Sequence, residues 1–276
     1  MSKVWFITGS SRGFGREWAT AALDRGDRVA ATARDASTLD DLVTKYGDAI
    51  LPLTLDVTDR DAVFRTVERA HRHFGRLDVV VNNAGYGQFG FIEEIRESEA
   101  RDQFETNVFG ALWVVQAALP FLREQGSGHF LQVSSIGGIT AYPNIGIYNA
   151  SKWALEAISQ SLSQEVASLG IKVTLLEPAL YATDWGGPSA KHATAIEAYD
   201  DIKKAAAEAR AKRVSSPGHP EATKSVVLKL VDMEKPPLRI FFGDGPLAQA
   251  TREYESRLAE WRQGEPLSVE AHGPKD

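Results

Sequence analysis

The chain has 276 residues, 43% hydrophobic and 25% charged, which suits one large α/β domain with a sizeable buried core. Its net charge of −6 argues against nucleic acid or an anionic membrane as the main partner, although a local basic pair can still bind an anionic cofactor. The absence of cysteine excludes disulfides, thiolate metal sites and a cysteine nucleophile.

The first eight residues hold one basic side chain and a short apolar run. A secretion signal needs a longer apolar stretch and a small-residue cleavage site, and no window reaches the roughly 20 apolar residues of a membrane span. We therefore expect a cytoplasmic protein without a membrane span.

Short runs rich in Val, Ile and Leu alternate with longer amphipathic segments over the first two thirds of the chain. The runs predict strands and the amphipathic segments predict helices. In chain order, strands are expected at 3–8, 29–33, 51–55, 78–81, 130–133 and 172–176, and helices at 14–25, 37–46, 59–74, 101–123 and 148–169. Strands buried on both faces and joined by helices indicate a doubly wound, Rossmann-type parallel sheet of about seven strands, with helices on both sides.

This rhythm breaks after Glu177. Segment 179–194 contains paired glycines and a proline, whereas 195–213 is charged and resembles a helix. We expect 179–213 to be a substrate-loop insertion over the edge of the sheet that carries the active site.

The C-terminal part returns to the earlier pattern. A seventh strand is expected at 238–242 and a further helix at 249–261. The tail 264–276 is polar and aperiodic, so it is expected to lie on the surface or to fray. Without an internal repeat or a linker, residues 1–276 are interpreted as a single domain.

A glycine-rich turn follows the first predicted strand and opens the first helix. A phosphate needs backbone N–H donors at close range, which a Cβ would obstruct, and a helix N-terminus adds positive potential. Plain turns also contain three glycines, but the position between strand and helix predicts nucleotide binding. The candidate cofactor contacts in this turn are Gly9, Ser11, Arg12, Gly13, Phe14 and Gly15.

The end of the second strand bears on the choice of cofactor. An NAD site usually places an acidic residue here for the ribose hydroxyl, whereas this strand ends with Ala33 followed by Arg34. Arg34 and Arg12 are placed to bind a 2′-phosphate through charge-assisted bonds, which favours NADP(H) over NAD(H). Alternatively, Arg34 is a solvated loop residue, and Asp35 either caps the next helix or binds the ribose.

Tyr148 and Lys152 lie four residues apart at the start of a predicted helix and therefore share one face. A free tyrosine has a pKa of about 10, and a nearby cation lowers it. Such a tyrosine can exchange a proton with a carbinol oxygen. Pairs of this kind also occur by chance on solvated helix faces.

Further polar residues follow neighbouring strands. Ser135 ends the fifth strand, where a hydroxyl can donate to a developing negative charge on a substrate oxygen. Asn83 and Gly85 follow the fourth strand, and Asn107 lies inside a predicted helix although asparagine is a poor helix former. Local capping or turn formation is the alternative for each.

These motifs together resemble the short-chain dehydrogenase/reductase family, in its short single-domain branch, over about residues 3–185. An extended nucleotide-sugar relative would more often show Gly-x-x-Gly-x-x-Gly, whereas this turn is Gly-x-x-x-Gly-x-Gly. The residues that carry the resemblance are Thr8, Gly9, Gly13, Gly15, Asp56, Val57, Asn82, Asn83, Ala84, Gly85, Asn107, Ser135, Tyr148 and Lys152.

The resemblance implies a catalytic set with a proton relay. Tyr148 would be the acid/base, and Ser135 would orient the substrate oxygen. Lys152 would bind the nicotinamide ribose and depress the Tyr148 pKa. Asn107 would hold a water that links Lys152 to solvent.

The resemblance also implies the remaining cofactor contacts, with one departure. Where the family usually carries Pro-Gly after the sixth strand, this chain has Pro178-Ala179-Leu180. Thr183 still falls where the family often binds the carboxamide. The cofactor contacts implied outside the glycine-rich turn are Asp56, Val57, Asn83, Ala84, Gly85, Tyr148, Lys152, Pro178 and Thr183.

The expected substrate pocket is apolar, which suits a bulky hydrophobic ketone, aldehyde or alcohol. Similarity to hydroxysteroid and retinol dehydrogenases suggests lipid-like substrates by analogy. The alternative is that several of these side chains only pack against one another. The candidate lining residues are Phe89, Ile136, Tyr142, Ile145, Leu180, Tyr181 and Trp185.

The sequence thus predicts an NADP(H)-dependent oxidoreductase acting on a small molecule. The six histidines lack zinc-ligand spacing, so no metal is expected in the chemistry. The resemblance implies a homodimer or homotetramer through helices 101–123 and 148–169. Two alternatives stay open: a non-enzymatic NADP-sensing regulator, and an epimerase or dehydratase on the same fold.

Overall fold

A seven-stranded sheet forms the centre of the computed structural model, which describes residues 2–187, 189–213 and 216–273. Its order is β3-β2-β1-β4-β6-β7-β9, and every neighbouring pair is parallel. The doubly wound Rossmann-type fold is therefore confirmed, with its switch point between β1 and β4. The strands are β1 Val4–Ile7, β2 Arg28–Ala33, β3 Ile50–Thr54, β4 Val79–Asn82, β6 Gly128–Val133, β7 Ile171–Pro178 and β9 Arg239–Phe242.

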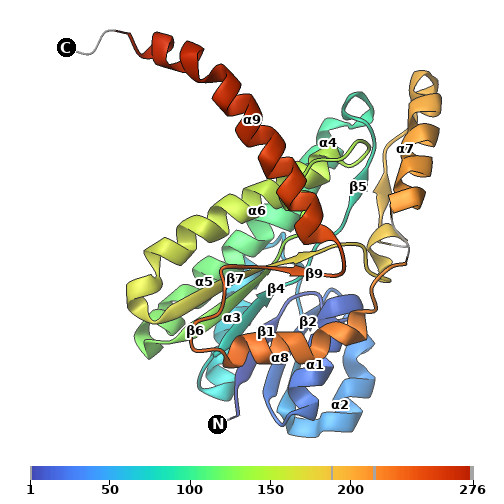
Figure 1. Cartoon of the computed structure of the whole chain (residues 1–276). Helices are drawn as coiled ribbons and strands as arrows, with labels where there is room; N and C mark the ends of the chain where they lie inside the picture. Colours follow the sequence, from blue (N-terminus) through green and yellow to red (C-terminus); the bar gives the residue numbers. More distant parts are fainter. Residues whose placement is uncertain (1, 188, 214–215, 274–276) are drawn as a thin grey trace.

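Both faces of the sheet are buried, because successive strand residues point to opposite sides. In β1, Val4 and Phe6 join one apolar cluster, while Trp5 and Ile7 join the other. One face is covered by α1 (Gly13–Asp24), α2 (Asp40–Tyr46) and α8 (Lys224–Asp232); the other by α3 (Arg60–Phe74), α5 (Gly110–Gln125) and α6 (Gly146–Glu165) (Figure 1). Helix α8 was not expected from the sequence.

The helix expected at 101–123 is divided in the structure. Helix α4 covers Glu97–Phe104, a π-helical turn covers Glu105–Phe109, and α5 follows from Gly110. A π turn holds an extra residue, so it rotates the residues within it relative to a regular helix. Asn107 lies in this turn and is buried.

A small second sheet joins the insertion to the body. Strand β5 (Gln88–Phe89) pairs in parallel with β8 (Lys191–His192). Helix α7 begins at Asp200 rather than near 195 and ends at Arg213. Segment 179–213, termed the lid here, thus runs alongside the chain that follows β4 (Figure 1).

The C-terminal helix is longer than expected. Helix α9 spans Pro246–His272 and passes through Gly264 and Pro266, so residues 264–272 lie on the surface as expected but form a helix instead of fraying. The helix projects from the body (Figure 1), and solvent can satisfy the carbonyl that Pro266 leaves unpaired. Residues 274–276 lie outside the described part. No helix in the described ranges has the length and apolarity needed to cross a membrane.

Candidate active site

The glycine-rich turn connects β1 to α1 at the carboxyl edge of the sheet. Gly9 and Gly13 adopt positive φ angles of 69° and 55°, which residues with a Cβ rarely adopt. At Gly15 a Cβ would lie 2.4 Å from the Gly9 carbonyl oxygen and 2.5 Å from Asn83 Nδ2. The turn is therefore closed so tightly that only glycine fits at position 15.

Thr8 ties this turn to the end of β4. Its Oγ1 accepts hydrogen bonds of 3.0 Å from the backbone N–H groups of Asn83 and Ala84 and donates to the Val81 carbonyl. The Asn83 side chain donates to the Thr8 and Gly9 carbonyls, both at 3.0 Å. Residues 83–84 are thus fixed beside the turn. Thr8 was quoted in the sequence motif, but its role as the central acceptor was not foreseen.

The surroundings of the turn fit a nucleotide diphosphate. Glycines remove side chains from its surface, and the N-terminus of α1 begins within it at Gly13. Thr183 of the lid lies beside the turn, because its Cγ2 is 3.7 Å from where a Gly13 Cβ would be. The turn, the end of β4 and the lid therefore meet at one place.

Arg34 and Asp35, which directly follow β2, have different surroundings. Asp35 accepts hydrogen bonds from Ser37 N at 3.0 Å and Ser37 Oγ at 2.7 Å, and these bonds lower its pKa. Asp35 is thus engaged as the cap of the following helical turn. Arg34 is exposed at the point where the strand ends.

Asp56 and Val57, which follow β3 and are expected to contact the cofactor, differ in their surroundings. The Asp56 carboxylate accepts from Thr58 N at 3.0 Å and Thr58 Oγ1 at 2.8 Å. Val57 is buried, and a Cβ at Gly110 would lie 2.7 Å from its Cγ2. Val57 therefore packs under the start of α5 while Asp56 remains exposed.

Ser135 and Tyr148 approach each other around Gly137. The Ser135 hydroxyl caps a short helical turn by accepting from Gly137 N at 3.0 Å. A Cβ at Gly137 would lie 3.3 Å from Tyr148 Cε1 and 3.4 Å from Ser135 Oγ. Lys152, one turn further along α6, donates a 2.7 Å hydrogen bond to the Val133 carbonyl, and its Nζ is 5.8 Å from the Tyr148 ring centroid.

Burial dominates the ionisation of this group. It raises the pKa of Tyr148 to about 12, opposed by a hydrogen bond with Ser135, and it lowers the pKa of Lys152 to about 8. The expected depression of the Tyr148 pKa by Lys152 is therefore not seen in the protein alone. Its phenol is enclosed, and the ammonium is held by Val133 instead.

Asn107 fixes the backbone between β4 and β5. Its Oδ1 accepts from Tyr86 N at 3.2 Å, and its Nδ2 donates to the Tyr86 carbonyl and to Ser151 Oγ at 3.1 and 3.2 Å. Its carboxamide also lies next to Gly85, where a Cβ would be 3.1 Å from Oδ1 and 3.7 Å from Lys152 Nζ. The π turn thus places Asn107 close to Lys152.

Trp185 of the lid covers Tyr148. The two ring centroids are 4.9 Å apart, and the Phe89 ring lies 5.2 Å from that of Trp185. Gly87 makes room for the indole, because a Cβ there would come within 2.8 Å of it. Tyr148 consequently keeps only 5% of its surface exposed.

The lid is attached to the body by polar contacts that the sequence did not reveal. The buried Glu94 carboxylate forms an ion pair with Lys203 of α7 and accepts from Ile196 N at 2.8 Å. The hydrogen bond from Lys203 is the largest cause that lowers the pKa of Glu94 to about 2. Tyr199 donates to Glu93 in the same region. Two adjacent glutamates and a charged helix a hundred residues later do not by themselves indicate that the two segments form an ion pair.

The remaining candidate substrate residues are divided between two places. Ile136 follows Ser135, and Ile145 pairs with Gly90. Tyr181 turns toward α1 instead, where its ring meets Phe14 at 5.0 Å. Leu180 is half-buried, and its carbonyl accepts from Gly218 N.

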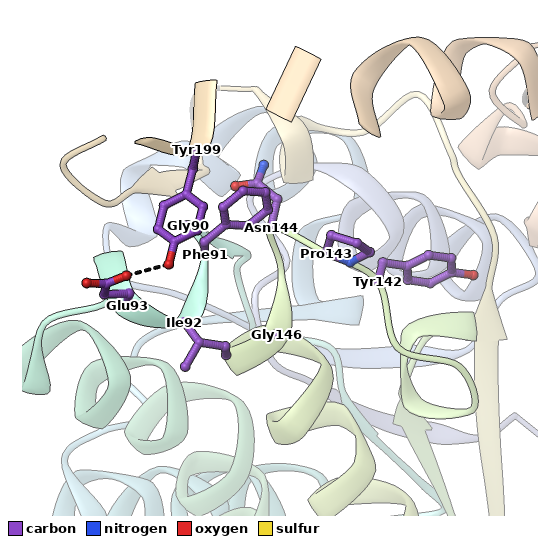
Figure 2. Close-up of a pocket in the computed structure, with 9 residues that line it drawn as sticks. All are labelled: Gly90, Phe91, Ile92, Glu93, Tyr142, Pro143, Asn144, Gly146 and Tyr199. Atoms are coloured by element: carbon purple, nitrogen blue, oxygen red, sulfur yellow. Dashed lines mark hydrogen bonds between the residues drawn. The ribbon is translucent and has the colours of Figure 1, made fainter. Parts of the chain in front are cut away.

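A cavity of about 270 Å³ opens between the segment after β5 and the start of α6 (Figure 2). Phe91, Ile92 and Tyr199 give it an apolar wall with Glu93 at one end. Tyr142 lies at the other end and points away from Glu93, and its hydroxyl is bonded by Gln249 of α9. The lining includes none of Ser135, Tyr148 and Lys152.

Comparison with known proteins identifies the class. A model of the short chain dehydrogenase family matches residues 3–194. Oxidoreductase BOA17 of Botryotinia fuckeliana (strain B05.10) is 43% identical over 268 residues, which cover 95% of this chain and 98% of that protein. This chain therefore belongs to the short-chain dehydrogenase family and is an oxidoreductase.

Solved structures agree. A short-chain dehydrogenase from Streptomyces avermitilis has a TM-score of 0.89 and 38% identity, covering 98% of both chains. An alcohol dehydrogenase from the archaeon Thermococcus sibiricus, complexed with 5-hydroxy-NADP, has a TM-score of 0.72 and 27% identity, covering 88% of this chain and 96% of that chain. At least one similar protein thus binds a nicotinamide dinucleotide of the NADP type.

The closure of the glycine-rich turn gives a first prediction. Gly15→Ala should weaken NADPH binding at least about tenfold and destabilise the fold by about 1–3 kcal/mol, because the new methyl group overlaps the Gly9 carbonyl. Titration of NADPH fluorescence and urea unfolding measure the two effects. Gly264→Ala is the control, since nothing outside its own helix backbone lies within 4 Å of its Cβ position. Parent-like NADPH affinity in Gly15→Ala would show that the turn is not the diphosphate site.

Proposed function

We propose that this protein is an NADP(H)-dependent oxidoreductase that interconverts a ketone or aldehyde with the corresponding alcohol, with Tyr148 as acid/base. The observation that carries the proposal is that Tyr148 and Ser135 both lie against Gly137, with Lys152 one helical turn further along α6. This group lies at the same edge of the sheet as the glycine-rich turn. A proton donor, an oxygen-binding hydroxyl and a dinucleotide cradle are thereby combined in one site.

Each side chain has a task that its contacts support. When bound, the nicotinamide would supply or accept the hydride. The Tyr148 hydroxyl would donate a proton to the substrate oxygen during reduction and accept it during oxidation. Ser135 Oγ accepts from Gly137 N and its hydroxyl is hydrogen-bonded to Tyr148, so the Ser135 hydrogen would turn to the substrate oxygen when substrate binds. We assign Lys152 to electrostatic support of Tyr148 and to the nicotinamide ribose.

Asn107 and the remaining cofactor contacts complete the proposed site. Asn107 would hold the water that links Lys152 to solvent, since its carboxamide lies close to Lys152. The dinucleotide would lie along the glycine-rich turn and residues 83–85. Asp56 and Val57 would flank its adenine, and Pro178 and Thr183 would meet its nicotinamide end.

We propose NADP(H) rather than NAD(H) because the end of β2 offers a cation. Asp35 is engaged in capping Ser37, whereas Arg34 is exposed at the strand end. Arg12 in the glycine-rich turn would share the 2′-phosphate with Arg34. A paired guanidinium site suits a phosphate and offers a ribose hydroxyl no acceptor.

The proposed substrate is bulky and hydrophobic. Trp185 and Phe89 form an aromatic wall against Tyr148. Ile136 follows Ser135 in the chain, and Ile145 precedes Tyr148 by three residues. Such a wall favours an apolar carbonyl compound over a small polar one. We propose in addition a cytoplasmic homodimer or homotetramer formed through α5 and α6. Phe109, in the π-helical turn just before α5, is exposed and stacks on Trp113 of α5.

Tyr148→Phe tests the proposed acid/base. The variant should lose turnover by about 100-fold or more, because a general acid contributes about that much or more. NADPH affinity should stay near the parent value, since the ring that packs against Trp185 is kept. The measurements are kcat with a ketone and the Kd of NADPH. Residual kcat within tenfold of the parent would remove Tyr148 from this role.

Arg34→Ala tests the choice of cofactor. Loss of one charge-assisted contact should weaken NADPH binding by roughly ten- to a hundredfold, corresponding to about 1.5–3 kcal/mol, and leave NADH nearly unchanged. Adding Ala33→Asp should repel the phosphate, offer the ribose an acceptor and shift preference toward NADH. The readout is kcat/KM for both cofactors in parent and variants. A parent that already prefers NADH would contradict the assignment of Arg34.

Trp185→Ala tests the aromatic wall. Removing the indole uncovers Tyr148, so the ranking of ketones of graded size should shift toward bulkier members while the Kd of NADPH changes less than threefold or so. Trp261→Ala on α9 is the control, because that side chain is 63% exposed. An unchanged ranking across the ketone panel would place the substrate elsewhere.

A further inference from the structure

Two buried carboxyl groups lie against one partly exposed guanidinium behind the candidate active site. Glu156 on α6 and Glu177 on β7 have only 6% and 1% of their surfaces exposed. Arg239 on β9 lies between them, with its Nε 3.0 Å from Glu156 Oε2 and 3.6 Å from Glu177 Oε1. Gln160 accepts a further bond from Arg239 at 2.7 Å.

This cluster adjoins Lys152. Glu156 lies one helical turn after Lys152 on the same face of α6. The Lys152 ammonium is bonded to the Val133 carbonyl, and the next residue, Ser134, faces Glu156. Gly138 permits this approach, because a Cβ there would lie 2.7 Å from Ser134 Oγ and 3.0 Å from Glu156 Cγ.

The cluster holds one cation for two carboxyl groups. Within the described part of the chain, one oxygen of Glu156 and one of Glu177 have no hydrogen-bond donor. Two facing carboxylates in a buried site cannot both ionise cheaply, so one proton is retained between them. Burial, and then the facing Glu156, raise the pKa of Glu177 to about 8; Glu156 is raised by burial and opposed by Ser134 and Arg239.

We propose that Glu156 is a positioning residue whose carboxylate keeps Lys152 in its ammonium form, while Glu177 retains the proton of the pair and leaves the charge on Glu156. Glu156 faces Lys152 on its own helix, Glu177 on β7 and Arg239 on β9, with the Ser134 hydroxyl at the end of β6. Arg239 offsets only part of the Glu156 charge, because its guanidinium is partly exposed, so water screens it, and it also bonds to Gln160. The link from this charge to catalysis rests on the function proposed for Lys152 above.

The direction of the effect follows from the charges. Burial favours the neutral amine of Lys152, and the Glu156 carboxylate favours the ammonium. Removing the Glu156 charge should therefore let Lys152 lose its proton at a lower pH. Removing the Glu177 carboxyl should have little effect, because an amide there imitates the protonated acid.

Direct titration of Lys152 in the full-length protein tests the proposal. The protein is labelled with ¹³C at lysine Cε, and the Lys152 signal is assigned by its loss in Lys152→Met. Its midpoint is followed by NMR in the parent, Glu156→Gln and Glu177→Gln. We expect the midpoint to fall by about one pH unit in Glu156→Gln and to move by less than about 0.3 unit in Glu177→Gln.

The matched carboxyl-to-amide changes separate a charge effect from damage to the core. Equal shifts in the two variants, or an unchanged midpoint in Glu156→Gln, would overturn the proposal. If Glu156→Gln does not fold, Glu156→Asp supplies the measurement: a charge-based role requires its midpoint to stay within about 0.5 unit of the parent. A larger fall in that variant would overturn the proposal.

Activity then distinguishes this inference from the proposed function. The alkaline limb of the kcat profile for ketone reduction should move to lower pH together with the Lys152 midpoint. If the midpoint shifts while the limb does not, Glu156 still sets the charge of Lys152, but the catalytic role assigned to Lys152 fails. If neither shifts, Glu156 has no such role.

Discussion

The buried ammonium of Lys152 is the constraint around which the candidate site is arranged. Taking a cation out of water costs several kcal/mol even after the protein relaxes, so its neighbours must offset that cost. The Val133 carbonyl does so directly through a 2.7 Å hydrogen bond at the end of β6, and the Glu156 carboxyl adds an opposite charge one turn away. Because β6 is paired on both sides by β4 and β7, the acceptor cannot move away without loss of sheet hydrogen bonds. A central strand therefore fixes the position of Lys152, and α6 carries Tyr148 with it.

Enclosure of the same edge by the lid explains the state of Tyr148. The indole of Trp185 rests on its ring, and burial raises the Tyr148 pKa to about 12. In the proposed reaction, a substrate carbonyl would have to displace Trp185 to reach the hydroxyl, and that movement would admit solvent or cofactor groups that change the electrostatics. The lid is anchored through the pairing of β8 with β5, whose Phe89 also packs against Trp185, and through the ion pair of Glu94 with Lys203. Movement of Trp185 alone would leave both anchors in place.

Much of the architecture could be predicted because the central strands of the sheet are buried on both faces, which leaves apolar runs in the sequence. The division of the helix expected at 101–123 could not, since the π turn at Asn107 is set by contacts with Tyr86 and Ser151, far away in sequence. The two-residue strands β5 and β8 are too short for a hydrophobic period to show in the sequence.

In the candidate site, Ser135, Tyr148 and Lys152 could be proposed from motifs. The cover of Trp185 over Tyr148 could not, because it depends on the space left by Gly87, nearly a hundred residues earlier. Glu156 could have been suspected from its spacing to Lys152, but its partners on β7 and β9 required the fold.

Net transfer of a hydride to or from a carbinol carbon distinguishes the proposed enzyme from a protein that senses the cofactor or uses it transiently. The most direct measurement is the reduction of a ketone with NADPH in which both hydrogens on C4 of the nicotinamide are replaced by deuterium. The product alcohol is then examined by mass spectrometry. The site described here should give one deuterium on the carbinol carbon of each product molecule, with one NADPH oxidised per turnover. Product without that label, or substrate conversion without net NADPH oxidation, would contradict it.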